Sequence, residues 1–472
     1  MTENVIKVAV VGHTNTGKTS LLRTLTCDQS FGQVTDAPGT TREVISLPVF
    51  LDGAPALAWF DTPGLEDSVG LRDWIDGLSD PVKRLDGVER VERFLNDPQA
   101  RAHFEQESRV LAQVLKSDAL LYVVDARENV LAKHRDELHL LQSCGKPVLP
   151  ILNFVASQQA NPQPWIDVFA RHAMHIHLSF DTISPPINGQ QAMYETLGQL
   201  LGARQTVLRA LGQQAAIQRC HRLRAAVSLL ATLCVTSAAC RRRAQDEPDA
   251  VVAATGLLEQ EVRGYERQFV TDLLKLYQFS EHDFLTHTTG WDGSSWSTDL
   301  FDKQTLKALG IDLGKGAAVG GAIGATFDVL TAGLSLGAGT AIGATAGSAW
   351  QGLGRWGKDL GAKILGQREL MVGDAALIVL VKRNADLIQA LERRGHAAQQ
   401  PVVLSPKAAS GPDRGAKELI RFFNIVRRQS LRLDALGLLR SYGPQRSLTE
   451  QAQTVIVQAT GLKALLLDEL HC

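Results

Sequence analysis

Residues 12–20, GHTNTGKTS, decide the fold expected for the N-terminal part of this 472-residue chain. They contain the complete pattern GxxxxGK[ST], with Gly12, Gly17, Lys18 and Thr19 at its fixed positions. Glycines let backbone N–H groups curl around phosphate oxygens, the lysine binds the β- and γ-phosphates, and the threonine hydroxyl can ligate Mg²⁺. The loop predicts a nucleotide site made by Gly12, His13, Thr14, Asn15, Thr16, Gly17, Lys18, Thr19 and Ser20.

The sequence around the loop alternates between strand and helix patterns. A valine-rich run at 5–12 precedes the loop, and the helical run LLRTL follows it. Further strands are expected at 43–51, 56–60, 119–126, 147–155 and 174–179, with helices at 131–143, 164–173 and 192–202. This alternation predicts an α/β fold with a doubly wound, mostly parallel sheet and the ligand at the carboxyl ends of the strands.

The strand at 56–60 ends in DTPG, residues 61–64. In that position Asp61 is expected to hold Mg²⁺ through water, and the Gly64 N–H is expected to contact the γ-phosphate. We therefore expect a domain over 1–205, with a charged helical insertion around 65–117 over the nucleotide side of the sheet.

The composition excludes several classes of protein. A hydrophobic fraction of 44% and a charged fraction of 21% are typical of an ordinary folded chain. Lys+Arg 49 against Asp+Glu 50 gives no net basicity, so no nucleic-acid partner is indicated. The six cysteines show no metal-site spacing and are interpreted as reduced thiols. The polar first residues show no signal peptide, which predicts a cytoplasmic protein.

Three motifs, GHTNTGKTS, PGTTRE at 38–43 and DTPG, together resemble the Era/TrmE-type bacterial P-loop GTPases. The likeness covers about two-fifths of the chain. It implies a slow, Mg²⁺-dependent GTPase switch in which Lys18, Thr41, Asn15 and Gly64 are catalytic. Thr41, with Thr40 as the alternative, would close over the metal, which Thr19 and Asp61 also hold. The resemblance further implies that Asn15 binds K⁺ beside the phosphates.

The chain departs from this family at two places. The residue after DTPG is Leu65, which cannot orient a water as the glutamine of Ras-like proteins does; either backbone and another residue hold the water, or Leu65 is simply packed. Where the family has NKxD, residues 153–156 are NFVA. Asn153 can bond the base and brace the phosphate loop, Phe154 can stack on the base, and Ser179 falls where a loop contacting guanine is expected. Ala156 lacks the carboxylate that reads guanine, so ATP or relaxed purine specificity stays open.

Residues 206–472 are expected to form an all-α domain, similar in arrangement to a bacterial helical domain of unknown function that follows an Era-like GTPase domain. Amphipathic helices are expected at 258–277 and 417–440. The second carries Arg421, Arg427, Arg428 and Arg432, a basic face that is either solvated or rests on an anionic membrane or RNA.

Glycines at four-residue spacing mark the segment 316–354, whose only charge is Asp328. They are Gly316, Gly320 and Gly324, and then Gly339, Gly343 and Gly347. Such spacing predicts a hairpin of closely packed helices turning at about 328–336. A helix over 329–350 would be ~33 Å long, enough to span a bilayer. The uncharged run 225–239 is too short to do so. The alternatives are a soluble core or peripheral docking on the inner face of a membrane.

Three functions follow as candidates: a hydrolytic switch read by the helical domain, a nucleotide-dependent scaffold with little hydrolysis, and a ribosome or RNA assembly factor. The neutral charge argues against the third.

Overall fold

The computed structural model describes residues 5–28, 31, 43–80, 83–279, 327–329, 367–398, 414–435, 446–460 and 462. It divides into two compact units, 1–219 with 393–399, and 220–392 with 400–472. The division falls inside helix α9, Gln205–Ala239, and not at residue 205, where the sequence suggested it.

A six-stranded sheet forms the centre of the first unit, in the order β2-β3-β1-β4-β5-β6. The strands are β1 Ile6–Val11, β2 Ile45–Leu51, β3 Ala54–Asp61, β4 Ala119–Asp125, β5 Val148–Asn153 and β6 Leu178–Ser179. Only β2 runs antiparallel among these pairings. Val10 of β1 pairs with Asp61 on one side and Leu121 on the other, so the ends of β1 and β3 lie together. The predicted doubly wound, mostly parallel sheet is confirmed.

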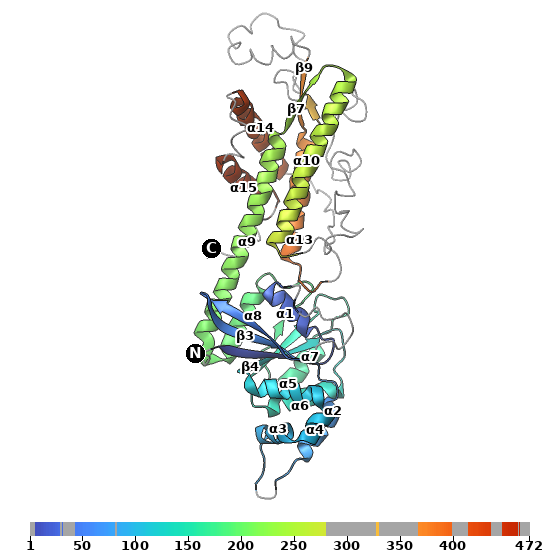
Figure 1. Ribbon diagram of the computed structural model, residues 1–472, viewed down its shortest axis with the longest axis vertical. Helices are drawn as coiled ribbons and strands as arrows, with labels where there is room; N and C mark the ends of the chain where they lie inside the picture. The colour runs from blue at the N-terminus through green and yellow to red at the C-terminus, as the bar shows by residue number, and fades with distance from the viewer. Residues whose placement is uncertain are drawn as a thin grey trace, which may run out of the picture. The chain divides into compact units, whose positions relative to one another are not determined.

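Helices cover both faces of this sheet (Figure 1). On one face lie α1 Lys18–Thr26, α8 Gly189–Leu200 and the start of α9, whose apolar residues share a core with Val8, Val10 and Leu121. On the other lie α5 Glu105–Lys116, α6 Ala132–Ser143 and α7 Gln163–Arg171, packed on Ala9 and Tyr122. Strands buried on both faces explain the continuous apolar runs of β1, β4 and β5.

Four helices join β3 to β4, where the sequence indicated a helical insertion. They are α2 Ser68–Gly77, α3 Gly87–Asn96, α4 Pro98–His103 and α5. Aspartates begin the first three: the side chain of Asp67 accepts from Gly70, Asp86 forms a capping box with Glu89, and Asp97 caps α4. Such caps satisfy N–H groups that have no partner inside the helix. The last helix, α5, leads directly into β4.

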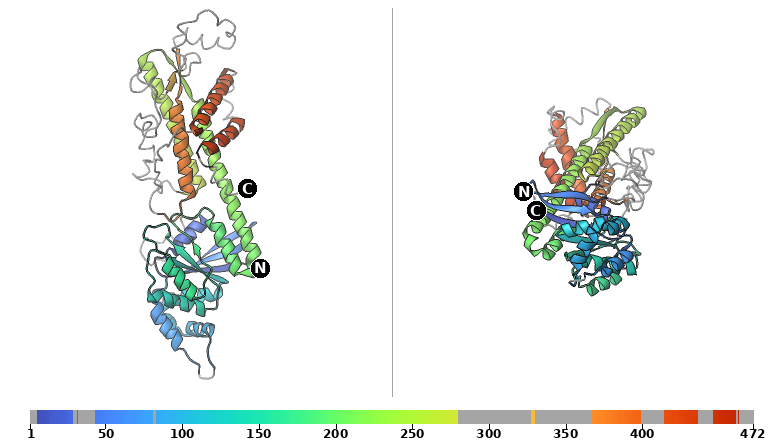
Figure 2. Two further views of the ribbon diagram at one scale, coloured as in Figure 1. Left: turned by 180° about the vertical axis from the view of Figure 1, so that it is seen from behind. Right: turned by 60° about the horizontal axis from the view of Figure 1, so that its bottom comes forward.

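The second unit is mainly helical. Besides most of α9 it contains α10 Pro248–Leu276, α13 Asp374–Glu392, α14 Arg414–Ala435 and α15 Arg446–Thr460. Helix α10 is joined to α13 by hydrogen bonds of Glu266, and α14 lies beside α15 (Figure 2). The expected amphipathic helix at 258–277 is present in α10, with Leu258, Val262, Phe269 and Leu273 buried.

The helical prediction for this part omitted a small sheet. Strands β7 Arg241–Gln245, β8 Phe327–Val329 and β9 Gln367–Val372 form an antiparallel sheet in the order β7-β9-β8. The run RRRAQ is polar and short, so it carries no alternating apolar pattern that would mark it as a strand. The sequence predicted that residues 327–329 lie where a helix ends and a turn begins, but in the structure they form a strand. The rest of the glycine-rich segment 316–354 lies outside the described residues.

Charged side chains are buried in this second unit and are paired. Glu266 of α10 accepts from Arg383 Nε at 2.7 Å and from Asn384 Nδ2 at 2.7 Å. Arg427 of α14 is buried, pairs with Asp374 at 2.6 Å and donates to the Val372 carbonyl at 2.6 Å. Arg427 therefore does not belong to an exposed basic face, whereas Arg421 and Arg428 are exposed.

Among the described residues, one helical stretch, Gly202–Ala239, is long and apolar enough to cross a membrane by length and composition alone. Of its most apolar window, 56% is buried inside the protein, as in core helices of soluble proteins.

Candidate nucleotide-binding site

The phosphate loop lies between β1 and α1 and depends on glycine at two positions. Gly12 has φ 145° and Gly17 has φ 91°, both in the region that glycine favours. A Cβ on Gly12 would lie 2.3 Å from the Val123 carbonyl oxygen, and one on Gly17 would lie 2.3 Å from Asn153 Nδ2. Asn15 also has a positive φ, 67°, a conformation for which asparagine is enriched. The loop is therefore fixed in shape before a ligand binds.

Lys18, the first residue of α1, lies buried beneath this loop. Its Nζ donates to the carbonyls of Gly12 at 3.0 Å and His13 at 2.7 Å. Burial lowers the pKa of Lys18 to about 8, while Asp61, Glu137 and Glu66 oppose that shift. The ammonium thus lacks full charge compensation, and the phosphates of a nucleotide would supply it.

Thr19 and Asp61 form the candidate magnesium site. The Thr19 hydroxyl donates to Asp61 Oδ2 at 2.7 Å. Asp61 is fully buried, which raises the pKa of its carboxyl group. Its Oδ1 has no hydrogen-bond partner within the part of the chain that the structure describes. A hydroxyl beside a buried carboxylate with an unused oxygen fits Mg²⁺. Thr40 and Thr41, also predicted here, lie outside the described residues.

A cavity of about 250 Å³ opens beside the loop. Its lining includes residues predicted from the sequence: Thr14, Asn15, Gly17, Lys18, Thr19, Ser20, Gly64 and Phe154. Thr62 and Gln106 complete it. Gln106 comes from the first turn of α5 and was missed, because no motif marks it. Six other predicted residues that the structure describes do not line this cavity: Gly12, His13, Thr16, Asp61, Asn153 and Ser179.

The DTPG segment is tied to the phosphate loop. The Thr62 hydroxyl donates to the Val10 carbonyl at 2.7 Å, and the Leu65 N–H donates to the Gly12 carbonyl at 3.3 Å. A Cβ on Gly64 would lie 2.3 Å from Thr14 Oγ1, so the two segments pass closely. Leu65 is fully buried in the core beneath α2 and α5. The Leu65 side chain is therefore packed in the core in this structure.

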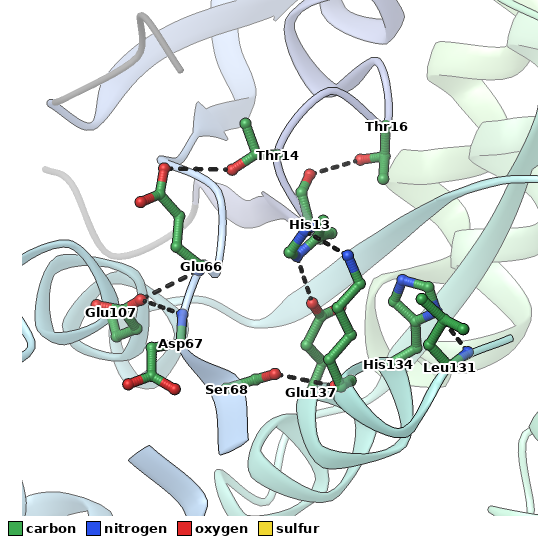
Figure 3. Close-up of polar contacts among 12 residues, drawn as sticks. His13, Thr14, Thr16, Glu66, Asp67, Ser68, Glu107, Leu131, His134 and Glu137 are labelled. Atoms are coloured by element: carbon green, nitrogen blue, oxygen red, sulfur yellow. Dashed lines mark hydrogen bonds and ion pairs between the residues drawn. The ribbon is translucent and has the colours of Figure 1, made fainter. Parts of the chain in front are cut away.

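A carboxylate on α6 anchors the second residue of the loop (Figure 3). Lys133 Nζ lies 2.7 Å from His13 Nε2, so this nitrogen accepts and His13 Nδ1 carries the proton. That Nδ1 lies 3.0 Å from Glu137 Oε1. Glu137 is fully buried and also accepts from Tyr122 OH at 2.7 Å. These contacts tie His13, and with it the phosphate loop, to α6, an attachment that the sequence motif alone did not indicate.

Glu107 on α5 holds the chain that leaves DTPG. Its Oε1 accepts the N–H of Glu66 at 3.1 Å and that of Asp67 at 3.0 Å, as Figure 3 shows. Glu107 is 5% exposed. A buried carboxylate with two backbone donors fixes the segment directly after Leu65.

Asn153 braces the far side of the loop. Its Nδ2 donates to the Thr16 carbonyl at 2.9 Å, and its Oδ1 accepts from Phe154 N at 2.8 Å and Thr182 N at 3.0 Å. The predicted bracing role of Asn153 thus has a geometric basis. Phe154 lines the cavity, and the Arg127 guanidinium lies over its ring, 4.0 Å from the ring centre.

A carboxylate that sequence reasoning missed lies near Ala156. Asp181 Oδ2 accepts the Ala156 N–H at 2.9 Å, and its Oδ1 accepts from Ile183 N at 2.9 Å and Ser184 N at 3.0 Å. Asp181 is 3% exposed, so three backbone donors and burial commit it to shaping the loop after β6. Ser179, predicted near the base, is exposed.

The fold and this site define the N-terminal part as a P-loop GTPase domain of the TrmE/Era type. A family model described as 50S ribosome-binding GTPase matches residues 7–154. A second model, described as a domain of unknown function (DUF3482), matches residues 167–437, more than half of the chain. The chain belongs to the DUF3482 family.

Curated relatives match the N-terminal part. The tRNA modification GTPase MnmE of Ruthia magnifica subsp. Calyptogena magnifica is 30% identical over 178 residues, 37% of this chain and 32% of that protein. GTPase Der of Persephonella marina is 29% identical over 152 residues, 32% of this chain and 27% of that protein. The chain thus spans less than a third of these relatives' length.

A solved structure of Era in complex with MgGDPNP and part of 16S ribosomal RNA is 17% identical. The match covers 42% of this chain and 57% of the Era chain, with a TM-score of 0.30.

Proposed function

We propose that this protein binds GTP with Mg²⁺ and hydrolyses it slowly to GDP and phosphate, as a molecular switch. The observation that carries the proposal is the cavity in which Lys18, Thr19 and Gly64 meet, with the unused Asp61 oxygen beside Thr19. A buried lysine and a hydroxyl–carboxylate pair on one cavity are what a triphosphate with its metal requires.

Bound Mg²⁺ would neutralise charge on the β- and γ-phosphates. Thr19 and Asp61 are the residues of this chain that would hold it, and Thr41 remains a third candidate from the sequence. Lys18 would exchange its two loop carbonyls for phosphate oxygens, and the Gly64 N–H would face the γ-phosphate.

Potassium is proposed as a second cation. Asn15 lines the cavity with its backbone held in the left-handed region. Its amide oxygen is the type of ligand that an alkali cation takes beside the phosphates. The resemblance to TrmE-type GTPases is what suggests K⁺ over Na⁺.

The alternative is a nucleotide-dependent scaffold with little hydrolysis. Two observations favour it: Leu65 is buried, and Ala156 offers no carboxylate to guanine. Phosphate release from GTP, measured with Mg²⁺ in KCl and in NaCl, separates the two. The switch proposal predicts phosphate release that is faster in KCl than in NaCl. No release above background in either salt would favour the scaffold function.

Contact with a membrane through the segment 316–354 stays a prediction from the sequence. Cell fractionation with each nucleotide would test it, and full recovery in the soluble fraction would contradict it.

A further inference from the structure

The proposed reaction needs a group that holds the attacking water. In Ras-like proteins a glutamine directly after the DxxG motif does so. Here Leu65 takes that position and is fully buried in the core. The next two residues are acidic: Glu66 Oε1 lies 3.5 Å from Thr14 Oγ1, and Asp67 caps α2 through Gly70 N. Neither offers the neutral amide that both accepts from water and donates to phosphate.

A glutamine reaches the cavity by another route. After Asp67 the chain leaves the site through α2, α3 and α4, and it returns at the first turn of α5. There Gln106 lines the same cavity as Thr62, Gly64 and Lys18. Within the described part of the chain, the Gln106 side chain has no hydrogen-bond partner. An amide that faces a phosphate cavity and is not committed elsewhere is available to a ligand.

The adjacent residue fixes the position of this glutamine. Glu107 is buried and accepts the N–H groups of Glu66 and Asp67 at 3.1 and 3.0 Å. Glu105, on the other side, pairs with Arg109 at 2.6 Å and is exposed. Glu107 therefore ties the start of α5 to the segment that follows DTPG, and this contact holds the neighbouring Gln106 at the cavity.

We propose that Gln106 is the catalytic glutamine of this GTPase, supplied by α5 at the end of the insertion instead of by the position after DTPG. Its Oε1 accepts a hydrogen bond from the attacking water, and its Nε2 donates to a γ-phosphate oxygen. The water oxygen forms a bond to the γ-phosphorus, and the bond from this phosphorus to the β–γ bridging oxygen breaks. The electron pair of that bond stays on GDP, and the water protons leave with the phosphate and solvent.

This inference rests on the proposed GTP hydrolysis, and its test separates the two. The full-length protein and Gln106→Ala are compared in single-turnover hydrolysis of GTP, with GTP affinity measured in parallel. We expect the rate constant to fall at least roughly tenfold, with the dissociation constant within about twofold of wild type. Gln99→Ala on α4, an exposed glutamine that does not line the cavity, is the matched control and should change neither quantity.

A second measurement does not depend on turnover. GDP with aluminium fluoride mimics the transferring phosphoryl group, so Gln106→Ala should weaken formation of that complex while GDP binding stays unchanged. If Gln106→Ala has the same rate constant as wild type and forms the fluoride complex equally well, the role of Gln106 is overturned while the proposed hydrolysis stands. Wild-type protein that binds GTP but neither hydrolyses it nor forms the fluoride complex would overturn both this inference and the proposed hydrolysis.

Discussion

The charge state of Lys18 is expected to couple nucleotide binding to protons. Burial lowers its pKa to about 8, so in the ligand-free protein this group is partly neutral above that pH. The negative phosphates favour the ammonium, which raises the pKa again on binding. Binding should therefore take up protons, and GTP affinity should fall as the pH rises above about 8.

Calorimetric titration with GTP at about pH 8.5, in buffers of different ionisation enthalpy, measures this uptake as up to about one proton per site. Lys18→Arg is the control, because a guanidinium stays protonated throughout this range. A binding enthalpy that does not depend on the buffer would contradict the assignment of Lys18.

Base selectivity is expected to respond to position 156. Ala156 lacks a carboxylate, and Asp181 is committed to three backbone N–H groups. Ala156→Asp should therefore strengthen the preference for GTP over ATP by on the order of 1.5–3 kcal/mol, roughly tenfold or more in relative affinity. Competition binding measures this preference. Gln158→Asp adds the same charge at an exposed site nearby and should leave the preference unchanged.

At the scale of elements, the attachment of α5 has a measurable energy. Replacing buried Glu107 with alanine leaves the amides of Glu66 and Asp67 without their acceptor. We expect the free energy of unfolding to fall by ~1–3 kcal/mol, and Glu107→Gln to recover part of that loss. Urea denaturation measures it. Glu105→Ala, which removes only an exposed pair with Arg109, should cost less than ~0.5 kcal/mol; equal effects of the two alanine variants would contradict the anchoring role.

The elements of the sheet were predictable because their signals are local. A complete phosphate-loop pattern and apolar strand runs each act over a few residues, and the structure confirms the strands that they indicated. Contacts between distant residues were not predictable. The contact of His13 with Glu137 and the place of Gln106 in the cavity depend on how α6 and α5 pack beside the loop. The contact of Asn153 with Thr182 depends on how the loop after β6 packs beside the end of β5. No spacing rule in a single sequence carries that information.

At the scale of the whole molecule, a short segment from within the helical C-terminal part belongs to the first unit. The segment 393–399 follows α13 directly, yet it is part of the first unit. Gly395 N donates to the Ile183 carbonyl at 2.9 Å. The adjacent Thr182 is held by Asn153 and accepts from Thr24 Oγ1 at 3.1 Å. The DUF3482 match, 167–437, includes both this segment and the loop that it contacts.

A substitution at Gly395 is therefore expected to reach the nucleotide site. A Cβ there would lie 1.9 Å from the Thr182 carbonyl oxygen, so Gly395→Ala must displace one of the two segments. We expect a loss of ~1–3 kcal/mol in stability, together with weaker GTP binding. Gly256→Ala on α10 is the matched control, because nothing lies within 4 Å of its added Cβ. That variant should be neutral or slightly stabilising, and the same result for Gly395→Ala would contradict the packing described here.

The cavity between the phosphate loop, DTPG and α5 is proposed to be a GTP site. Equilibrium titration of the full-length protein with GTP and Mg²⁺, beside Lys18→Met, tests it most directly. We expect one saturable site in the wild-type protein and its loss in the variant, with both proteins folded. Saturable binding that Lys18→Met leaves unchanged, or no binding by the folded wild-type protein, would contradict it.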